Sequence, residues 1–103
     1  MKTYQLKTKY SNYTAYISKA QYINGRLALS FHDATDGMKI LIATVNLPDV
    51  DLREGEVIIK DYSENEGLFN WGDKNGLWEF VADCATGYSI SKVVKLLKPV
   101  HEI

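Results

Sequence analysis

The segment Gln21-Tyr22-Ile23-Asn24-Gly25-Arg26-Leu27-Ala28-Leu29 decides the fold class that this 103-residue sequence predicts. Its Asn24-Gly25 pair tolerates the positive φ angles of a type I′ turn, the commonest two-residue connection between antiparallel strands. After the pair, Leu27 and Leu29 face one side of a strand while Ala28 faces the other. The segment therefore predicts a β-hairpin with its turn at Asn24-Gly25.

Further strands are predicted on both sides of this hairpin. Residues 3–7 and 13–18 alternate apolar and polar side chains, as half-buried strands do. Asp36-Gly37 marks a second hairpin and leads into residues 38–47, which are apolar on both faces and predict a central strand that Pro48 ends. Three more strands are predicted at residues 57–60, 78–82 and 89–97.

One short helix is predicted among the strands. Ser63-Glu64-Asn65-Glu66 has the spacing of a capping box, in which Ser63 accepts a hydrogen bond from the Glu66 N–H and the Glu66 carboxylate reaches back to Ser63. The helix should continue through residues 68–71 and end at Gly72 or Gly76. Residues 1–103 are therefore expected to form one α+β domain, with a curved antiparallel β-sheet and one short α-helix.

Composition places the chain among ordinary globular proteins. Hydrophobic residues make up 46% and charged residues 24%, which excludes an extended disordered chain. No apolar run approaches the roughly 20 residues of a membrane span, and the first residues do not resemble a secretion signal. The single cysteine, Cys84, cannot form an internal disulfide and fits a reducing compartment. We therefore expect a cytoplasmic protein without a membrane partner.

Motifs of catalytic, metal and cofactor sites are missing from the sequence. One cysteine and two widely separated histidines offer no zinc-ligand spacing. Neither a glycine-rich phosphate loop nor a nucleophile elbow is present. The expected protein is not an enzyme and needs no cofactor.

Acidic residues concentrate in one stretch, although the net charge is only −1. Residues 49–66 contain seven acids against Arg53 and Lys60. A fixed array of carboxylates can bind arginines that otherwise read phosphates or bases. The stretch predicts a partner-binding surface made of Asp49, Asp51, Glu54, Asp61, Tyr62, Glu64 and Glu66.

Tyrosines supply a second candidate surface near the N-terminus. Five of the seven lie in the first 22 residues, and tyrosine is favoured at recognition surfaces because it combines a rigid ring with a polar tip. Their interleaving with lysines also suits single-stranded nucleic acid, but the acidic middle of the chain argues against direct nucleic-acid binding. The five are Tyr4, Tyr10, Tyr13, Tyr16 and Tyr22.

Three short stretches of the sequence, at residues 24–29, 44–48 and 59–67, resemble those of a known protein family. They read Asn24-Gly25-Arg26-Leu27-Ala28-Leu29, Thr44-Val45-Asn46-Leu47-Pro48 and Ile59-Lys60-Asp61-Tyr62-Ser63-Glu64-Asn65-Glu66-Gly67. In these strings the chain resembles a family of small proteins carried by phages, plasmids and integrative elements. The resemblance implies a mobile-element setting, in which small acidic α+β proteins often inhibit host defence. It identifies no catalytic residue.

The function expected from these observations is inhibition of a bacterial defence system. The expected form is an anti-CRISPR protein that binds Cas9 or a related effector and blocks DNA binding or cleavage, because the nucleic-acid channel and PAM site of Cas9 are rich in arginine. It would act in the cytoplasm of the host bacterium. The alternative is a non-catalytic interaction module of a conjugative element, and a homodimer stays open.

Overall fold

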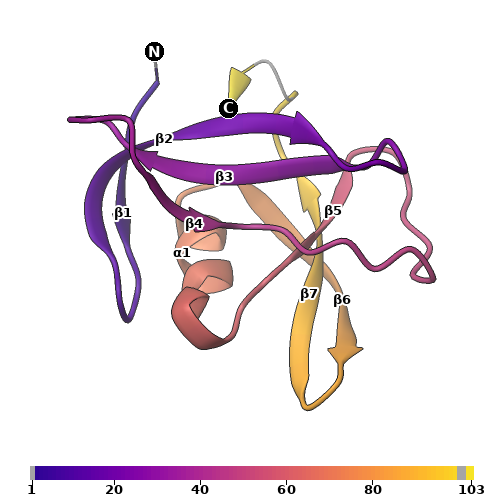
Figure 1. The fold of residues 1–103 in the computed structure, drawn as a ribbon. Helices are drawn as coiled ribbons and strands as arrows, with labels where there is room; N and C mark the ends of the chain where they lie inside the picture. Colours follow the sequence, from indigo (N-terminus) through magenta and orange to yellow (C-terminus); the bar gives the residue numbers. More distant parts are fainter. Residues whose placement is uncertain (1, 100–101) are drawn as a thin grey trace.

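The computed structural model describes residues 2–99 and 102–103, which fold into two antiparallel sheets and one short α-helix (Figure 1). The first sheet has the order β1-β2-β3-β4, with β1 at Tyr4–Lys7, β2 at Asn12–Gln21, β3 at Leu27–Asp33 and β4 at Lys39–Ile42. The second has the order β5-β7-β6, with β5 at Glu56–Ile59, β6 at Trp78–Thr86 and β7 at Ser89–Leu96. The predicted α+β class is confirmed.

The sheet that the sequence predicts as one is divided in two, and the two parts are joined at one bridge. Thr44 pairs with Ile59, and next to this bridge the Val45 N–H donates to the Ile58 carbonyl at 3.1 Å. Residues 38–47 are therefore not a central strand. The chain bonds to β3 as far as Ala43, whose N–H donates to the Leu29 carbonyl at 2.8 Å, and it then moves across to β5. β4 is consequently an edge of its sheet.

The hairpin predicted at residues 21–29 is confirmed, but its turn type is not. The Tyr22 N–H donates to the Arg26 carbonyl at 2.8 Å, and the Gly25 N–H donates to the Tyr22 carbonyl at the same distance. Of the turn residues only Gly25 has a positive φ, 86°, whereas a type I′ turn needs Asn24 there too. Asn24 instead accepts the Arg26 N–H on its Oδ1 atom, which stabilises a longer turn with a bulge at Gly25.

The last hairpin is longer than predicted. β6 continues past residue 82 to Thr86, with a bulge between Phe80 and Ala82, and β7 confirms the strand predicted at 89–97. The predicted connection at 85–87 is therefore shortened to the turn around Gly87, whose φ is 62°. Cross-strand pairing continues to the pair Thr86 and Ser89, so this β-ribbon projects from the body of the molecule (Figure 1).

The capping box predicted at residues 63–66 is wrong. Ser63 has a φ of 57° and opens a separate 3₁₀ turn, η1, at Ser63–Asn65, without a side-chain cap. Gly67, at φ 94°, then separates this turn from helix α1 at Leu68–Lys74. The Phe69 N–H in the first turn of α1 donates to Oδ1 of Asp61 at 2.9 Å, so Asp61 provides the cap. The predicted end of the helix near Gly76 is confirmed.

The core lies between the two sheets, and α1 covers one side of it (Figure 1). Trp71 of α1 packs edge-on against Phe31, with 5.5 Å between ring centroids, and its Nε1 donates to the Gln5 carbonyl. Trp78 packs against the helix at Gly72, where a Cβ would come within 2.0 Å of the indole ring. The other fully buried side chains of this core include Leu6, Leu29, Ile59, Leu68, Leu77 and Val94.

Candidate partner-binding groove

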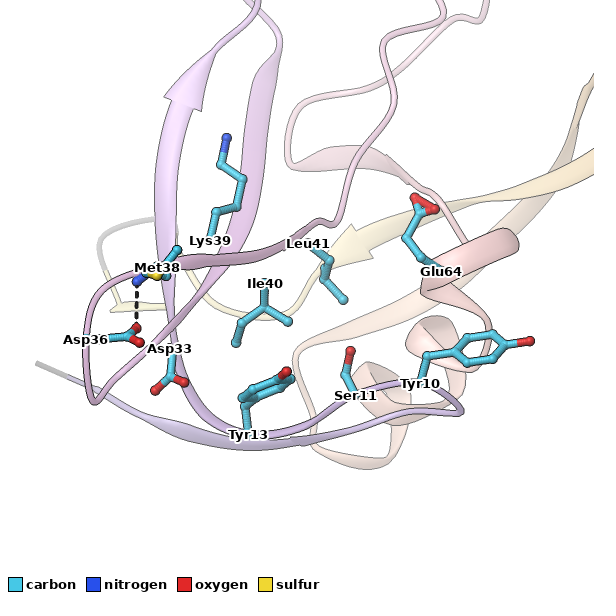
Figure 2. A pocket seen from close by; sticks show the side chains of 10 residues that line it. All are labelled: Tyr10, Ser11, Tyr13, Asp33, Asp36, Met38, Lys39, Ile40, Leu41 and Glu64. Carbon is cyan, nitrogen blue, oxygen red and sulfur yellow. Dashed lines mark hydrogen bonds between the residues drawn. The ribbon is translucent and has the colours of Figure 1, made fainter.

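A groove of about 410 Å³ lies between the start of β2 and strand β4 (Figure 2). One wall is formed by Tyr10 and Ser11, in the turn between β1 and β2, and by Tyr13 in β2. The other wall is the β3–β4 hairpin, from Asp33 and Asp36 to the β4 residues Lys39, Ile40 and Leu41. Glu64 of η1 completes the lining. The groove therefore joins three segments that are distant in sequence, at residues 10–13, 33–41 and 64.

Carboxylates dominate the charge of this groove. Asp33, Asp36 and Glu64 line it, together with one basic residue, Lys39. Figure 2 shows the Lys39 side chain directed away from Asp33 and Asp36. The groove therefore carries a negative potential that favours a cationic group.

The two aspartates are fixed by the turn that carries them. Oδ1 of Asp33 accepts the Thr35 N–H at 2.8 Å, and Oδ1 of Asp36 accepts the Met38 N–H at 2.9 Å. Such contacts between a side chain and the backbone two residues on are typical of aspartate in turns. In the described part of the chain, no hydrogen bond or ion pair engages the second oxygen of either carboxylate. Each aspartate is thus held in place and keeps an acceptor for a ligand.

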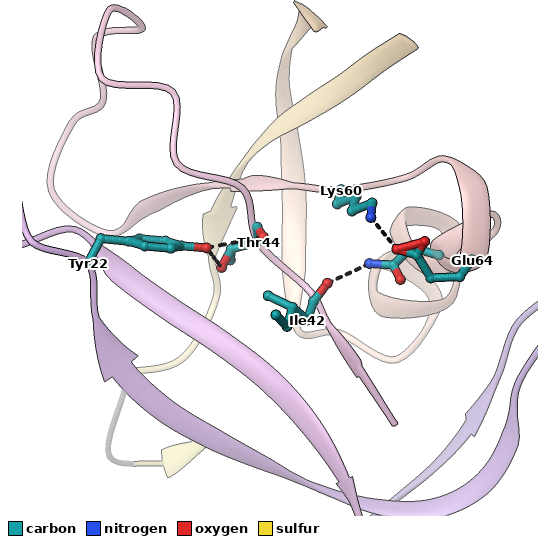
Figure 3. Close-up of polar contacts among 6 residues, drawn as sticks. Tyr22, Ile42, Thr44, Lys60 and Glu64 are labelled. Carbon is teal, nitrogen blue, oxygen red and sulfur yellow. Dashed lines mark hydrogen bonds and ion pairs between the residues drawn. The ribbon is translucent and has the colours of Figure 1, made fainter. Parts of the chain in front are cut away.

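Glu64 reaches the groove from the other side and is paired with Lys60 (Figure 3). The hydrogen bond from Lys60 holds the pKa of Glu64 below its ordinary value, so this carboxylate stays ionised at neutral pH. The Lys60 ammonium also lies 5.4 Å from the centroid of the Tyr62 ring. Lys60 neutralises part of the charge of Glu64 and orients its carboxylate.

Large apolar side chains form the rim of the groove. Tyr10 is 63% exposed, Met38 68% and Tyr13 41%. The face of a tyrosine ring attracts a cation, and the methionine thioether packs against many shapes. Together with the carboxylates, these side chains can hold both the alkyl stem and the charged head of an arginine or lysine.

The other acids predicted at residues 61–66 have structural partners. Asp61 is the helix cap described above, and the Glu66 carboxylate pairs with Lys9 at 2.8 Å. Tyr62 is half-buried below Lys60. The structure therefore places only Glu64 of this group in the groove.

The acids predicted in the loop after β4 lie apart from the groove. Arg26 holds this loop by donating from its guanidinium to the carbonyls of Leu47 and Val50. Asp51 lines a separate hollow of about 550 Å³ beside Cys84, and Glu54 lines another of about 330 Å³ beside Arg53. Asp49 is exposed on the same loop. The acidic stretch is thus divided between two surfaces.

The tyrosine-rich segment is divided in the same way. Only Tyr10 and Tyr13 line the groove. Tyr4 packs edge-on against Trp71, and Tyr16 stacks on His32 with 5.3 Å between ring centroids. The Tyr22 hydroxyl meets Thr44 near the junction of the two sheets (Figure 3).

Sequence reasoning missed the aspartates and the methionine of the β3–β4 hairpin. Asp36-Gly37 carried a signal, but that signal predicted a turn and gave no indication of a binding site. Pairing of β2 with β3 places Asp33 beside Ala15, and Asp33 and Met38 then line the same groove as Tyr13 (Figure 2).

No protein-family model, curated protein or solved structure matches this chain. Within residues 2–99 and 102–103, no helix has the length and apolar character needed to cross a membrane. The same residues include no group of three His, Cys, Asp or Glu side chains that could hold a metal ion.

Proposed function

We propose that this protein is a non-catalytic inhibitor that binds an arginine- or lysine-bearing surface of a bacterial defence protein. The proposed target is a CRISPR effector such as Cas9, and the proposed place of action is the cytoplasm of the host cell. The observation that carries the proposal is the groove lined by Asp33, Asp36 and Glu64 and by the exposed side chains of Tyr10 and Met38.

The chemistry of the groove suits the basic surface of a nucleic-acid enzyme. Arginines that read phosphates or a PAM present a planar fork of donors, which matches a carboxylate in two parallel hydrogen bonds. A hydrogen bond to a charged group contributes roughly 1.5–3 kcal/mol. The contribution is smaller for an ion pair that stays on an exposed rim. Filling such a surface would block DNA binding without any chemical step.

A second role, as an interaction module of a conjugative element, is supported by a different surface. The β6–β7 hairpin exposes Phe80, Tyr88 and Ile90, whose exposed fractions are 50%, 110% and 55%. Exposed apolar side chains on one projecting hairpin are typical of protein contact sites, including those of homodimers. In this role the partner would bind the β6–β7 hairpin, and the carboxylates of the groove would not contribute to binding.

The proposal is tested by plasmid interference in bacteria that express a CRISPR effector. The groove variant combines Asp33→Asn, Asp36→Asn and Glu64→Gln, because an asparagine amide keeps the acceptor that each turn requires while removing the charge. A matched control combines Asp49→Asn, Asp51→Asn and Glu54→Gln, which removes the same charge from the other acidic surface.

The wild-type protein and the control should protect the plasmid, and the groove variant should not. Protection at wild-type level by the groove variant would overturn the assignment of the groove. Failure of the wild-type protein to protect against any effector tested, while it binds another partner through the β6–β7 hairpin, would favour the second role.

A further inference from the structure

We infer that the groove binds an extended peptide segment, which adds as a short strand to the open edge of β4 and places a cationic side chain among the carboxylates. This inference rests on the proposed function, because it names the form in which the partner's basic residues would enter the groove.

The first observation is the position of β4. On one side β4 pairs with β3. On its other side, the described residues form a backbone bridge only beyond the end of β4, between Thr44 and Ile59. Three of its four residues, Lys39, Ile40 and Leu41, line the groove. An edge strand presents backbone N–H and carbonyl groups at the spacing that a further strand requires. The groove therefore runs along a template for strand addition.

The second observation marks where an added strand would stop. The fully buried Asn65 donates from Nδ2 to the Ile42 carbonyl at 2.7 Å. A side-chain amide thus bonds to the last residue of β4 as the N–H of a neighbouring strand would. Residues 39–41 remain as the part of this edge that lines the groove, which gives room for a short segment only.

The third observation is the distribution of charge and apolar surface. Asp33 and Asp36 lie at the hairpin end of the groove, and Glu64 lies across from them (Figure 2). Side chains of an added strand alternate between its two faces, so a basic residue at every second position would meet the carboxylates repeatedly. The alkyl stems would pack on Tyr13 and Met38. An acidic or a purely apolar segment does not fit this lining.

The probe is a fluorescein-labelled peptide, acetyl-Arg-Val-Arg-Val-Arg-amide, whose binding is followed by fluorescence polarisation in low salt. Two further peptides carry N-methyl groups, either on the arginine amides or on the valine amides. Because only alternate amides of an added strand face its neighbour, one methylated peptide should bind at least tenfold more weakly and the other as well as the parent.

The groove variant with Asp33→Asn, Asp36→Asn and Glu64→Gln should bind the parent peptide at least tenfold more weakly, and the control with Asp49→Asn, Asp51→Asn and Glu54→Gln should bind it normally. Equal binding of both methylated peptides would overturn strand addition, as would no binding of the parent. Peptide binding as expected, without plasmid protection in cells, would sustain this inference and remove the proposed defence target.

Discussion

Replacing Asp61 by alanine should destabilise the protein, because Asp61 caps helix α1 from outside the helix. Its Oδ1 atom accepts the Phe69 N–H at 2.9 Å, and Gly67, the residue before the helix, makes no side-chain cap. The first-turn N–H of Phe69 is partly buried and has no carbonyl of the helix to bond to. Loss of a cap of this kind costs about 1 kcal/mol.

The neighbouring Ser63 supplies the matched comparison. Its side chain caps neither η1 nor α1, so Ser63→Ala should change the free energy of unfolding by less than about 0.5 kcal/mol. Asp61→Asn keeps an acceptor oxygen for Phe69 and should lose less stability than Asp61→Ala. For a domain of this size, 1 kcal/mol lowers the unfolding temperature by about 4–8 °C.

Urea denaturation followed by tryptophan fluorescence measures these differences, since Trp71 and Trp78 are both buried. The expected order of midpoints is Asp61→Ala below Asp61→Asn, with Ser63→Ala close to wild type. An Asp61→Ala midpoint equal to wild type, or a Ser63→Ala midpoint as low as that of Asp61→Ala, would refute the assignment of the cap. Charge reversal at Asp61 would unfold part of α1, so binding tests should leave this residue intact.

Three further changes follow from the packing and the charges. Gly72→Ala should lower the free energy of unfolding, measured in urea, by about 3 kcal/mol or more, because the added Cβ would lie 2.0 Å from the Trp78 ring. The control is Asn70→Ala, on the exposed side of α1, which should change the free energy of unfolding little. Asn65→Asp should lower the free energy of unfolding by more than about 2 kcal/mol at neutral pH, since a carboxylate would face the Ile42 carbonyl that now accepts a hydrogen bond from Nδ2. An unchanged urea midpoint would contradict that contact. Because Lys60 lowers the pKa of Glu64, the pair stabilises the fold at neutral pH, and this contribution should disappear as the pH falls through the lowered pKa, below the ordinary 4.5. Glu64→Gln should remove that part of the pH dependence, and an identical profile in the variant would show that the pair adds nothing.

Local features of the fold could be predicted from the sequence, because local patterns determine them. Turn residues at Asn24-Gly25 and Asp36-Gly37 place two hairpins, and Gly76 ends the helix. The cap could not be predicted in this way. Asp61 lies eight residues before Phe69, and the chain between them has positive φ angles at both Ser63 and Gly67. The capping-box pattern at Ser63 ignores that break in the helix.

The residues of the candidate groove could be predicted only in part, because contacts between distant segments decide which of them lie together. Acids and tyrosines stand in two separate runs of the sequence, and neither run indicates which of its members lie together in the fold. The structure brings Glu64 together with Tyr10 and Tyr13, and it engages Glu66 with Lys9. Pairing across the sheet determines these neighbours, and one sequence does not contain that information.

The most direct test of the groove as the binding surface is an ¹H–¹⁵N correlation spectrum of the labelled protein, titrated with the arginine-valine peptide. Binding in the groove predicts that the shifted amides cluster at residues 10–13, 33–41 and 64 and that the spectrum of the loop at 49–55 stays unchanged. Shifts centred on residues 49–55 or on the β6–β7 hairpin, or no saturable shifts at all, would contradict the account.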